Sequence, residues 1–225
     1  DEKYFSPKDK SNIFANSDSK YSVTNRTIKS VMESELKNSK KSGNKWAYNN
    51  LLPHLIMNYI IFKSGEDGFV NLLEDIFTNK AKIEYDTSFA EPQTSTTEDR
   101  AITSTLLVTR YDYLRIAKAM LDDWQNDTCE GKYLKNIFEN RIDKDTKKIQ
   151  ALGGTSQWPY ARGYAGQFQT HYTGINKKRA VMGMHGYGGQ HVVIDFEKSR
   201  IVVTNSIHEN FNFKKIVYGP FKKDK

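Results

Sequence analysis

The chain reads Ala-Val-Met-Gly-Met-His-Gly-Tyr-Gly-Gly-Gln-His-Val-Val-Ile-Asp-Phe from Ala180 to Phe196. Two runs of β-forming residues flank a cluster of glycines that contains one imidazole, His185. Glycines this dense inside a strand pattern indicate either a close approach to the backbone or an ordinary hairpin with a bulge. This stretch alone leaves both interpretations open.

The sequence around this stretch continues as short strand patterns separated by turns. Candidate strands cover 163–170, 179–184, 190–196 and 200–205. Successive short strands joined by tight turns predict an antiparallel sheet, and helical patterns precede it, so the fold class is α+β with helices on the sheet. We expect a variable polar segment over 1–45, a helical region over 46–150, and a sheet portion with a C-terminal tail over 151–225, all in one domain.

The helical region opens with two predicted helices in succession. The first runs from Leu51 to about Lys63, with Asn50 as a helix cap and Gly65 placed to end it. The second covers about 68–78 and carries an apolar stripe, and the two together predict a helical hairpin packed on a core. The stripe consists of Phe69, Leu72, Leu73 and Ile76.

Three other segments have helical periodicity. Apolar residues keep helical spacing over 27–36, and a short helix is expected over 132–140. The clearest start is Thr109, an N-cap candidate with Asp112 three residues later. The stripe that follows it comprises Tyr113, Ile116, Ala117, Met120, Leu121 and Trp124.

Composition excludes several classes of function. The net charge of +7 is spread over short basic runs between acidic neighbours, and no nucleic-acid-binding signature accompanies it, which argues against nucleic acid as a partner. The longest apolar stretch, 51–62, is too short and polar to span a membrane. Cys129 is the single cysteine, so neither an intrachain disulfide nor a multi-thiolate metal site is expected.

Four motifs taken in order resemble one family. They are Trp46-Ala-Tyr48-Asn-Asn50, Thr109-Arg-Tyr-Asp112, the Gly163-Tyr164 strand and the glycine-rich segment around His185. Their order and spacing over about residues 40–206 resemble the serine β-lactamase and penicillin-binding-protein superfamily, above all its class C-like esterases and 6-aminohexanoate-dimer hydrolases. The resemblance implies a β-lactamase/transpeptidase-like sheet flanked by helices, and cleavage of a small ester or amide through an acyl-enzyme.

The resemblance also assigns candidate catalytic residues. Tyr48 matches the tyrosine that shuttles the nucleophile's proton, and Asn50 the asparagine that orients the substrate. His185 matches the Lys or His of an edge strand, where Gly183 and Gly186 let the backbone pair with substrate and the Met184 N–H donates to the oxyanion. Tyr48 as a buried aromatic, Asn50 as a helix cap and His185 as a structural histidine remain the alternatives.

The family's nucleophile motif, Ser-x-x-Lys, has one match ahead of Tyr48, Ser17-Asp-Ser-Lys20, which lies too close to Tyr48 and opens no apolar helix. We therefore expect the nucleophile on a missing or separate segment, with a second polypeptide completing the fold. The resemblance implies no metal or organic cofactor, and export to the periplasm or medium, although the residues do not indicate a compartment. The alternative function is a non-catalytic protein that uses the same fold for binding or assembly.

Overall fold

The computed structural model describes residues 4–5, 46, 51–90, 106–144, 161–186, 189–205, 212 and 214–222. They fall into two compact units, one formed by the residues up to Asp112 except Trp46, and the other by Trp46 with the residues from Tyr113 onward. The helix expected over 27–36 and the match at Ser17 and Lys20 lie outside the described residues. Helices and antiparallel strands together confirm the predicted α+β class.

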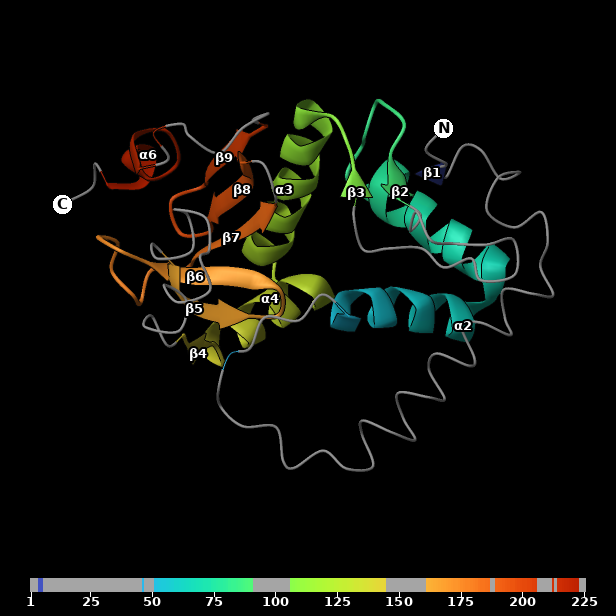
Figure 1. The fold of residues 1–225 in the computed structure, drawn as a ribbon, viewed down its shortest axis with the longest axis horizontal. Coiled ribbons are helices and arrows are strands. Elements are labelled where there is room, and N and C mark those ends of the chain that lie inside the picture. The colour runs from blue at the N-terminus through green and yellow to red at the C-terminus, as the bar shows by residue number, and fades with distance from the viewer. Residues whose placement is uncertain are drawn as a thin grey trace. The chain divides into compact units, whose positions relative to one another are not determined.

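The first unit contains helix α2 (Leu51–Leu73), which is broken at Gly65, where φ is 71°. Two helical arms meet at this break (Figure 1), as the sequence predicted. The π-helical segment η2 (Glu74–Lys80) continues the second arm. The buried face of that arm differs from the expected stripe, because Leu72 and Ile76 are exposed and their places are taken by other apolar side chains. Those that are buried are Phe69, Val70, Leu73 and Phe77.

Both sets of residues keep helical spacing, so the sequence did not decide which side of the apolar arc is covered. The covered side meets a small antiparallel sheet in the order β1 (Tyr4–Phe5), β2 (Ser88–Ala90), β3 (Leu106–Leu107). Phe77 of η2 contacts Phe89 of β2, with ring centroids 6.4 Å apart. This aromatic pair joins the helical arm to the sheet within the unit.

Helix α3 (Arg110–Gln125) begins at the predicted cap. The Asp112 N–H donates to Thr109 Oγ1 over 3.2 Å, and the Thr109 hydroxyl donates to the Asp112 carboxylate over 3.0 Å. The same carboxylate, which is fully buried, also accepts the N–H groups of Glu84 and Tyr85. The predicted stripe is confirmed, with Ala117 and Leu121 buried in the core.

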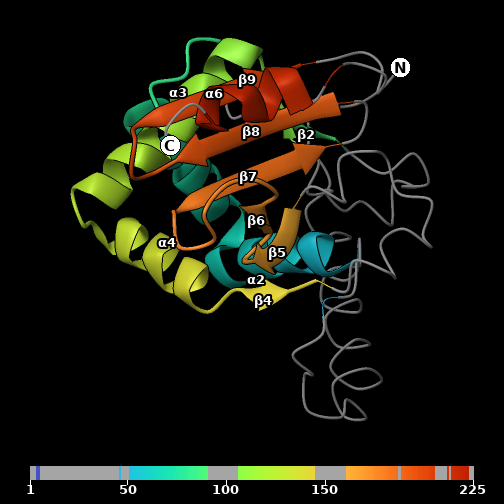
Figure 2. The ribbon, with the colours of Figure 1, turned by 90° about the vertical axis from the view of Figure 1, so that its left-hand side faces the viewer.

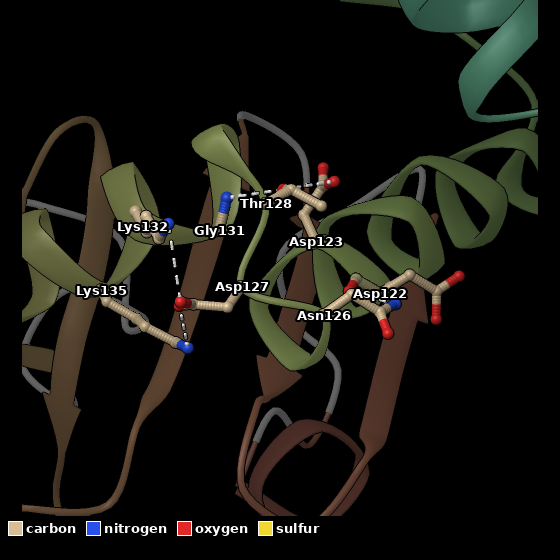
Figure 3. A network of polar contacts seen from close by, with 8 residues as sticks. All are labelled: Asp122, Asp123, Asn126, Asp127, Thr128, Gly131, Lys132 and Lys135. Atoms are coloured by element: carbon tan, nitrogen blue, oxygen red, sulfur yellow. Dashed lines mark hydrogen bonds and ion pairs between the residues drawn. The ribbon is translucent and has the colours of Figure 1, made fainter.

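A tight corner leads from α3 into helix α4 (Cys129–Glu139), and Figure 3 shows its polar contacts. Thr128 accepts the N–H of Gly131 and donates to the Asp123 carboxylate, which caps the helix three residues earlier than predicted. Asp127 lies in the corner with φ of 54° and pairs with Lys135 over 2.8 Å. The hydrogen bond from Lys135 lowers the pKa of the Asp127 carboxyl.

The second unit is built on a six-stranded antiparallel sheet in simple sequence order from β4 to β9 (Figure 2). Each strand therefore pairs with its neighbours in the chain, which is the predicted meander. The strands are β4 (Ile142–Asp143), β5 (Ala161–Ala165), β6 (Phe168–Tyr172), β7 (Val181–Gly186), β8 (Gln190–Asp195) and β9 (Arg200–Thr204).

The prediction of one strand over 163–170 is wrong, because the structure has two strands there, joined as the hairpin β5–β6. Gly166 and Gln167 form its two-residue turn, and both have positive φ, 51° and 73°. Paired positive φ values match the twist of a tight hairpin, and a glycine at the first position suits them. The predicted turn at 197–199 joins β8 to β9, and Ser199 has φ of 52°.

Helices cover both faces of this sheet. On one face, α3 and α4 bury Met182, Val192, Ile194 and neighbouring apolar side chains. On the other face, the segment η5 (Lys214–Tyr218) and the short helix α6 (Gly219–Lys222) bury Val181 and Val193 under Val217 and Phe221. Figure 1 shows α3 and α6 on opposite sides of β7, β8 and β9. We call these the α3 face and the α6 face.

Two arginines hold the C-terminal helix to the sheet. Arg179 pairs with the fully buried Asp195 and also donates to the carbonyl of Phe221 over 3.0 Å. Arg200 donates to the carbonyl of Pro220 over 3.0 Å. Within the part of the chain that the structure describes, no helix has the length and apolar character needed to cross a membrane.

Candidate functional site

The sequence-predicted site residues are only partly described. Tyr48 and Asn50 lie outside the described residues, as do Tyr187 and Gly188. Gly183, Met184, His185 and Gly186 all lie on β7, four consecutive positions at its C-terminal end. The structure therefore places the glycine-rich half of the predicted site on one strand.

The strand pairing of β7 changes along its length: its first residues pair with β6 and β8, and the described pairing of its last residues is with β8. It pairs with β8 along its whole length, from Val181 opposite Asp195 to Gly186 opposite Gln190. Among the described strands, β6 pairs with β7 only at Met182 and Gly183. The described strand pairing of residues 184–186 is therefore with β8, and we call these three residues the one-sided end of β7. The resemblance predicts His185 on an edge strand, whereas it lies near the end of β7, an inner strand of the described sheet.

The register fixes where the backbone amides of this end point. The Phe196 N–H donates to the Ala180 carbonyl over 2.9 Å, so Ala180 and Phe196 form a hydrogen-bonded pair. Such pairs alternate along an antiparallel ladder, and the register of β7 with β8 is continuous up to Gly186. The Met184 N–H is therefore directed toward β8. An oxyanion donor from β7 would come from the N–H of His185, which points away from β8.

His185 makes its closest described polar contact with a tyrosine from the neighbouring strand. The hydroxyl of Tyr172 lies 2.9 Å from His185 Nε2, and the two rings are stacked at 20° with centroids 5.8 Å apart. His171, just before Tyr172, has φ of 52°, which breaks the side-chain alternation of β6. As a result, Tyr172 lies on the α6 face although Phe168 of the same strand lies on the α3 face.

Gly183 leaves room for this contact. A Cβ at position 183 would lie 2.2 Å from the Tyr172 hydroxyl oxygen and 3.0 Å from the Val192 carbonyl oxygen. The first distance is shorter than a Cβ tolerates and the second is a tight contact, so any larger residue would displace Tyr172. Gly183, two residues before His185, therefore leaves the space that the Tyr172 hydroxyl occupies.

A second histidine stands opposite His185 across the hairpin. His191 of β8 is its register partner, and the two rings meet edge to face with centroids 4.6 Å apart. His191 is 1% exposed, and burial lowers its pKa to about 4. Burial, with smaller contributions from His191 and Lys144, holds the pKa of His185 well below its ordinary value. Both imidazoles are neutral near pH 7.

Lys144 adds a buried amine to this group. Its Nζ donates to Gln169 Oε1 over 2.6 Å and lies 5.4 Å from the ring centroid of Trp46. The residue is 5% exposed, and burial lowers its pKa to about 8. Gln169 is the register partner of Gly183, so Lys144 reaches the strand pair that carries Tyr172 and His185.

The chemistry available at these residues follows from their protonation states. Burial raises the pKa of Tyr172 well above its ordinary value, so the phenol stays protonated and does not act as a base here. The neutral imidazole of His185 offers one N–H donor and one acceptor nitrogen. The described residues contain no group of three metal-ligating side chains. The arrangement suits hydrogen bonding and proton transfer.

Sequence reasoning missed Tyr172, His191 and Lys144. For His191 a signal was available, because a hairpin closed around Gly188 places residues 185 and 191 opposite each other. For Tyr172 no such signal existed, since strict alternation from Phe168 would have put it on the other face. Lys144 resembles any basic residue of a polar segment.

Comparisons with protein-family models, curated proteins and solved structures found no match to this chain.

Proposed function

We propose that this chain supplies the sheet side of a β-lactamase-like serine hydrolase site, which cleaves a small ester or amide through an acyl-enzyme. The observation that carries the proposal is the one-sided end of β7, where described pairing to β6 stops at Gly183 and the His185 N–H points away from β8. A strand end of this kind is suited to pair with a substrate backbone and to donate to an oxyanion.

In this proposal each residue has a defined part. The serine nucleophile attacks the carbonyl and forms the acyl-enzyme, and Tyr48 accepts its proton and passes it to the leaving group. The N–H of His185 donates to the oxygen that becomes negatively charged. Its neutral imidazole provides a hydrogen bond at the same strand end. A water molecule then hydrolyses the acyl group, so no metal or organic cofactor is required.

Covalent labelling tests the proposal. The purified protein, with any polypeptide that co-purifies, is treated with a fluorophosphonate probe and with a fluorescent penicillin, and the adduct is located by peptide mass spectrometry. We expect one labelled serine. Tyr48→Phe should slow labelling by on the order of 10²-fold or more, as expected for loss of a general base. The matched control, Tyr133→Phe on the exposed face of α4, should label at the parental rate.

A non-catalytic binding protein is the second candidate. It is favoured by the neutral, buried state of the groups around His185, since Tyr172 stays protonated and His191 is enclosed. Absence of any serine adduct with both reagents would overturn the hydrolase proposal and leave this candidate. Labelling that is unaffected by Tyr48→Phe would remove Tyr48 from the mechanism.

A further inference from the structure

Tyr172 of β6 packs closely against Gly183 and His185 of β7. Tyr172 is 1% exposed, its hydroxyl lies 2.9 Å from His185 Nε2, and the space over Gly183 holds that hydroxyl. Tyr172 reaches this position because His171, with φ of 52°, turns the end of β6 toward the α6 face. The contact therefore depends on an unusual backbone conformation and on the lack of a side chain at position 183.

We infer that Tyr172 is a positioning residue, whose hydroxyl holds the His185 imidazole in one orientation and one tautomer at the one-sided end of β7. Gly183 provides the clearance that the hydroxyl occupies. The inference deepens the proposed function, and it rests on that function only for its consequence in catalysis. The positioning itself is a property of the folded chain and can be measured without any substrate.

The surroundings of His185 support this role. A protonated phenol beside a neutral imidazole gives a hydrogen bond in which the imidazole has a single tautomer, set by which group donates. His191 restricts the ring from a second side, with centroids 4.6 Å apart at 77°. Lys144 is the other basic group whose charge acts on His185. With the hydroxyl removed, we expect the ring to lose its fixed tautomer while the aromatic packing of residue 172 remains.

Imidazole nitrogen NMR on the full chain tests the inference. The protein labelled with ¹⁵N-histidine has five histidines, and His185→Gln assigns the signal of interest. We expect the parental His185 to show two well-separated nitrogen shifts that stay constant from pH 8 to pH 6. In Tyr172→Phe, the two shifts should move toward the average of the two tautomers. Tyr164→Phe is the matched control, because it removes a hydroxyl bonded to Gln167 on the β5–β6 hairpin.

A double-mutant cycle tests the clearance. Gly183→Ala should lower the urea midpoint in the parental chain and lower it less in the Tyr172→Phe background, because phenylalanine lacks the oxygen that the new Cβ would meet. Equal losses in the two backgrounds would contradict the role given to Gly183. Unchanged His185 shifts in Tyr172→Phe, or the same change in Tyr164→Phe, would overturn the inference. Failed serine labelling would overturn the proposed function and leave these readings unaffected.

Discussion

His185 and His191 face each other across the β7–β8 hairpin, with ring centroids 4.6 Å apart and planes at 77°. The pair lies on the face of the sheet that also carries Val193 and Tyr172. Burial keeps both imidazoles neutral near pH 7 and lowers the pKa of each. Two neutral rings pack as hydrophobic bodies, whereas two imidazolium ions at this separation would repel each other inside a poorly solvated site.

The histidine pair predicts loss of stability in mild acid. The folded pKa of His191, about 4, lies below the unfolded value near 6.5, so the unfolded chain binds more protons between these values. Stability contributed by neutral His191 is therefore present above about pH 6.5 and is lost as the pH falls toward 4, by about 3 kcal/mol. His185 adds to the loss in the same direction. Urea unfolding between pH 7.5 and 4.5 measures it.

The variant for this experiment is His191→Asn. It should flatten the pH dependence, since it removes one of the two titrating rings. A parental slope in His191→Asn would contradict the assignment of the acid sensitivity to His191.

The buried amine of Lys144 leads us to expect that stability rises with pH at the alkaline end of the profile. Its folded pKa of about 8 lies below the unfolded value near 10.4, so the unfolded chain binds more protons over this window and stability rises with pH. The gain between pH 8 and pH 10 should reach about 3 kcal/mol at most. Lys144→Met should remove this rise, while Lys118→Met on the exposed surface of α3 should leave it in place. A rise that persists in Lys144→Met would contradict the prediction.

Local signals in the sequence predicted the elements of the fold well. Thr109 with Asp112 marked the start of α3, and Gly65 marked the break in α2, because caps and positive φ values have local causes. The sheet order followed from short turns between successive strands. The errors came from tertiary choices. The strand pattern over 163–170 runs through the Gly166-Gln167 turn, and the packing of the first unit selects Phe77 over Ile76 for burial.

The candidate site was less predictable for a physical reason. Glycines flag a close approach but do not say what approaches, and at Gly183 it is Tyr172, brought there by the left-handed conformation of His171. Histidine adopts a positive φ more often than most residues but still only occasionally, so its residue type does not single out position 171. The burial of Lys144 depends on Gln169 and Trp46, which are distant in the sequence. Each of these contacts arises only when strands assemble.

The α3–α4 corner requires glycine at position 131. A Cβ at this position would lie 1.9 Å from the carbonyl oxygen of Asp123, and that backbone atom cannot move without opening the corner. We expect Gly131→Ala to cost about 3 kcal/mol or more, at the upper end of overpacking effects. Gly68→Ala is the control, since the nearest described atom to its Cβ would be the Ser64 Cβ at 3.1 Å, and it should change stability by under about 1 kcal/mol. Urea unfolding followed by circular dichroism compares the two, and similar midpoints would contradict the prediction.

We expect replacement of Arg179 to lower stability strongly, because Arg179 pairs with Asp195 and bonds to the Phe221 carbonyl. Asp195 is fully buried, so Arg179→Met leaves an uncompensated carboxylate and removes the bond to the Phe221 carbonyl. The expected cost is about 3–5 kcal/mol, and Arg179→Met combined with Asp195→Asn should recover part of it, because the buried charge is then gone. Arg200→Met loses an exposed bond to the Pro220 carbonyl and should cost under about 1 kcal/mol. Unfolding midpoints and proteolysis at the C-terminal helix report both effects. If the double variant is no more stable than Arg179→Met, the loss comes from the unfastened α6 helix and the charge of Asp195 contributes little.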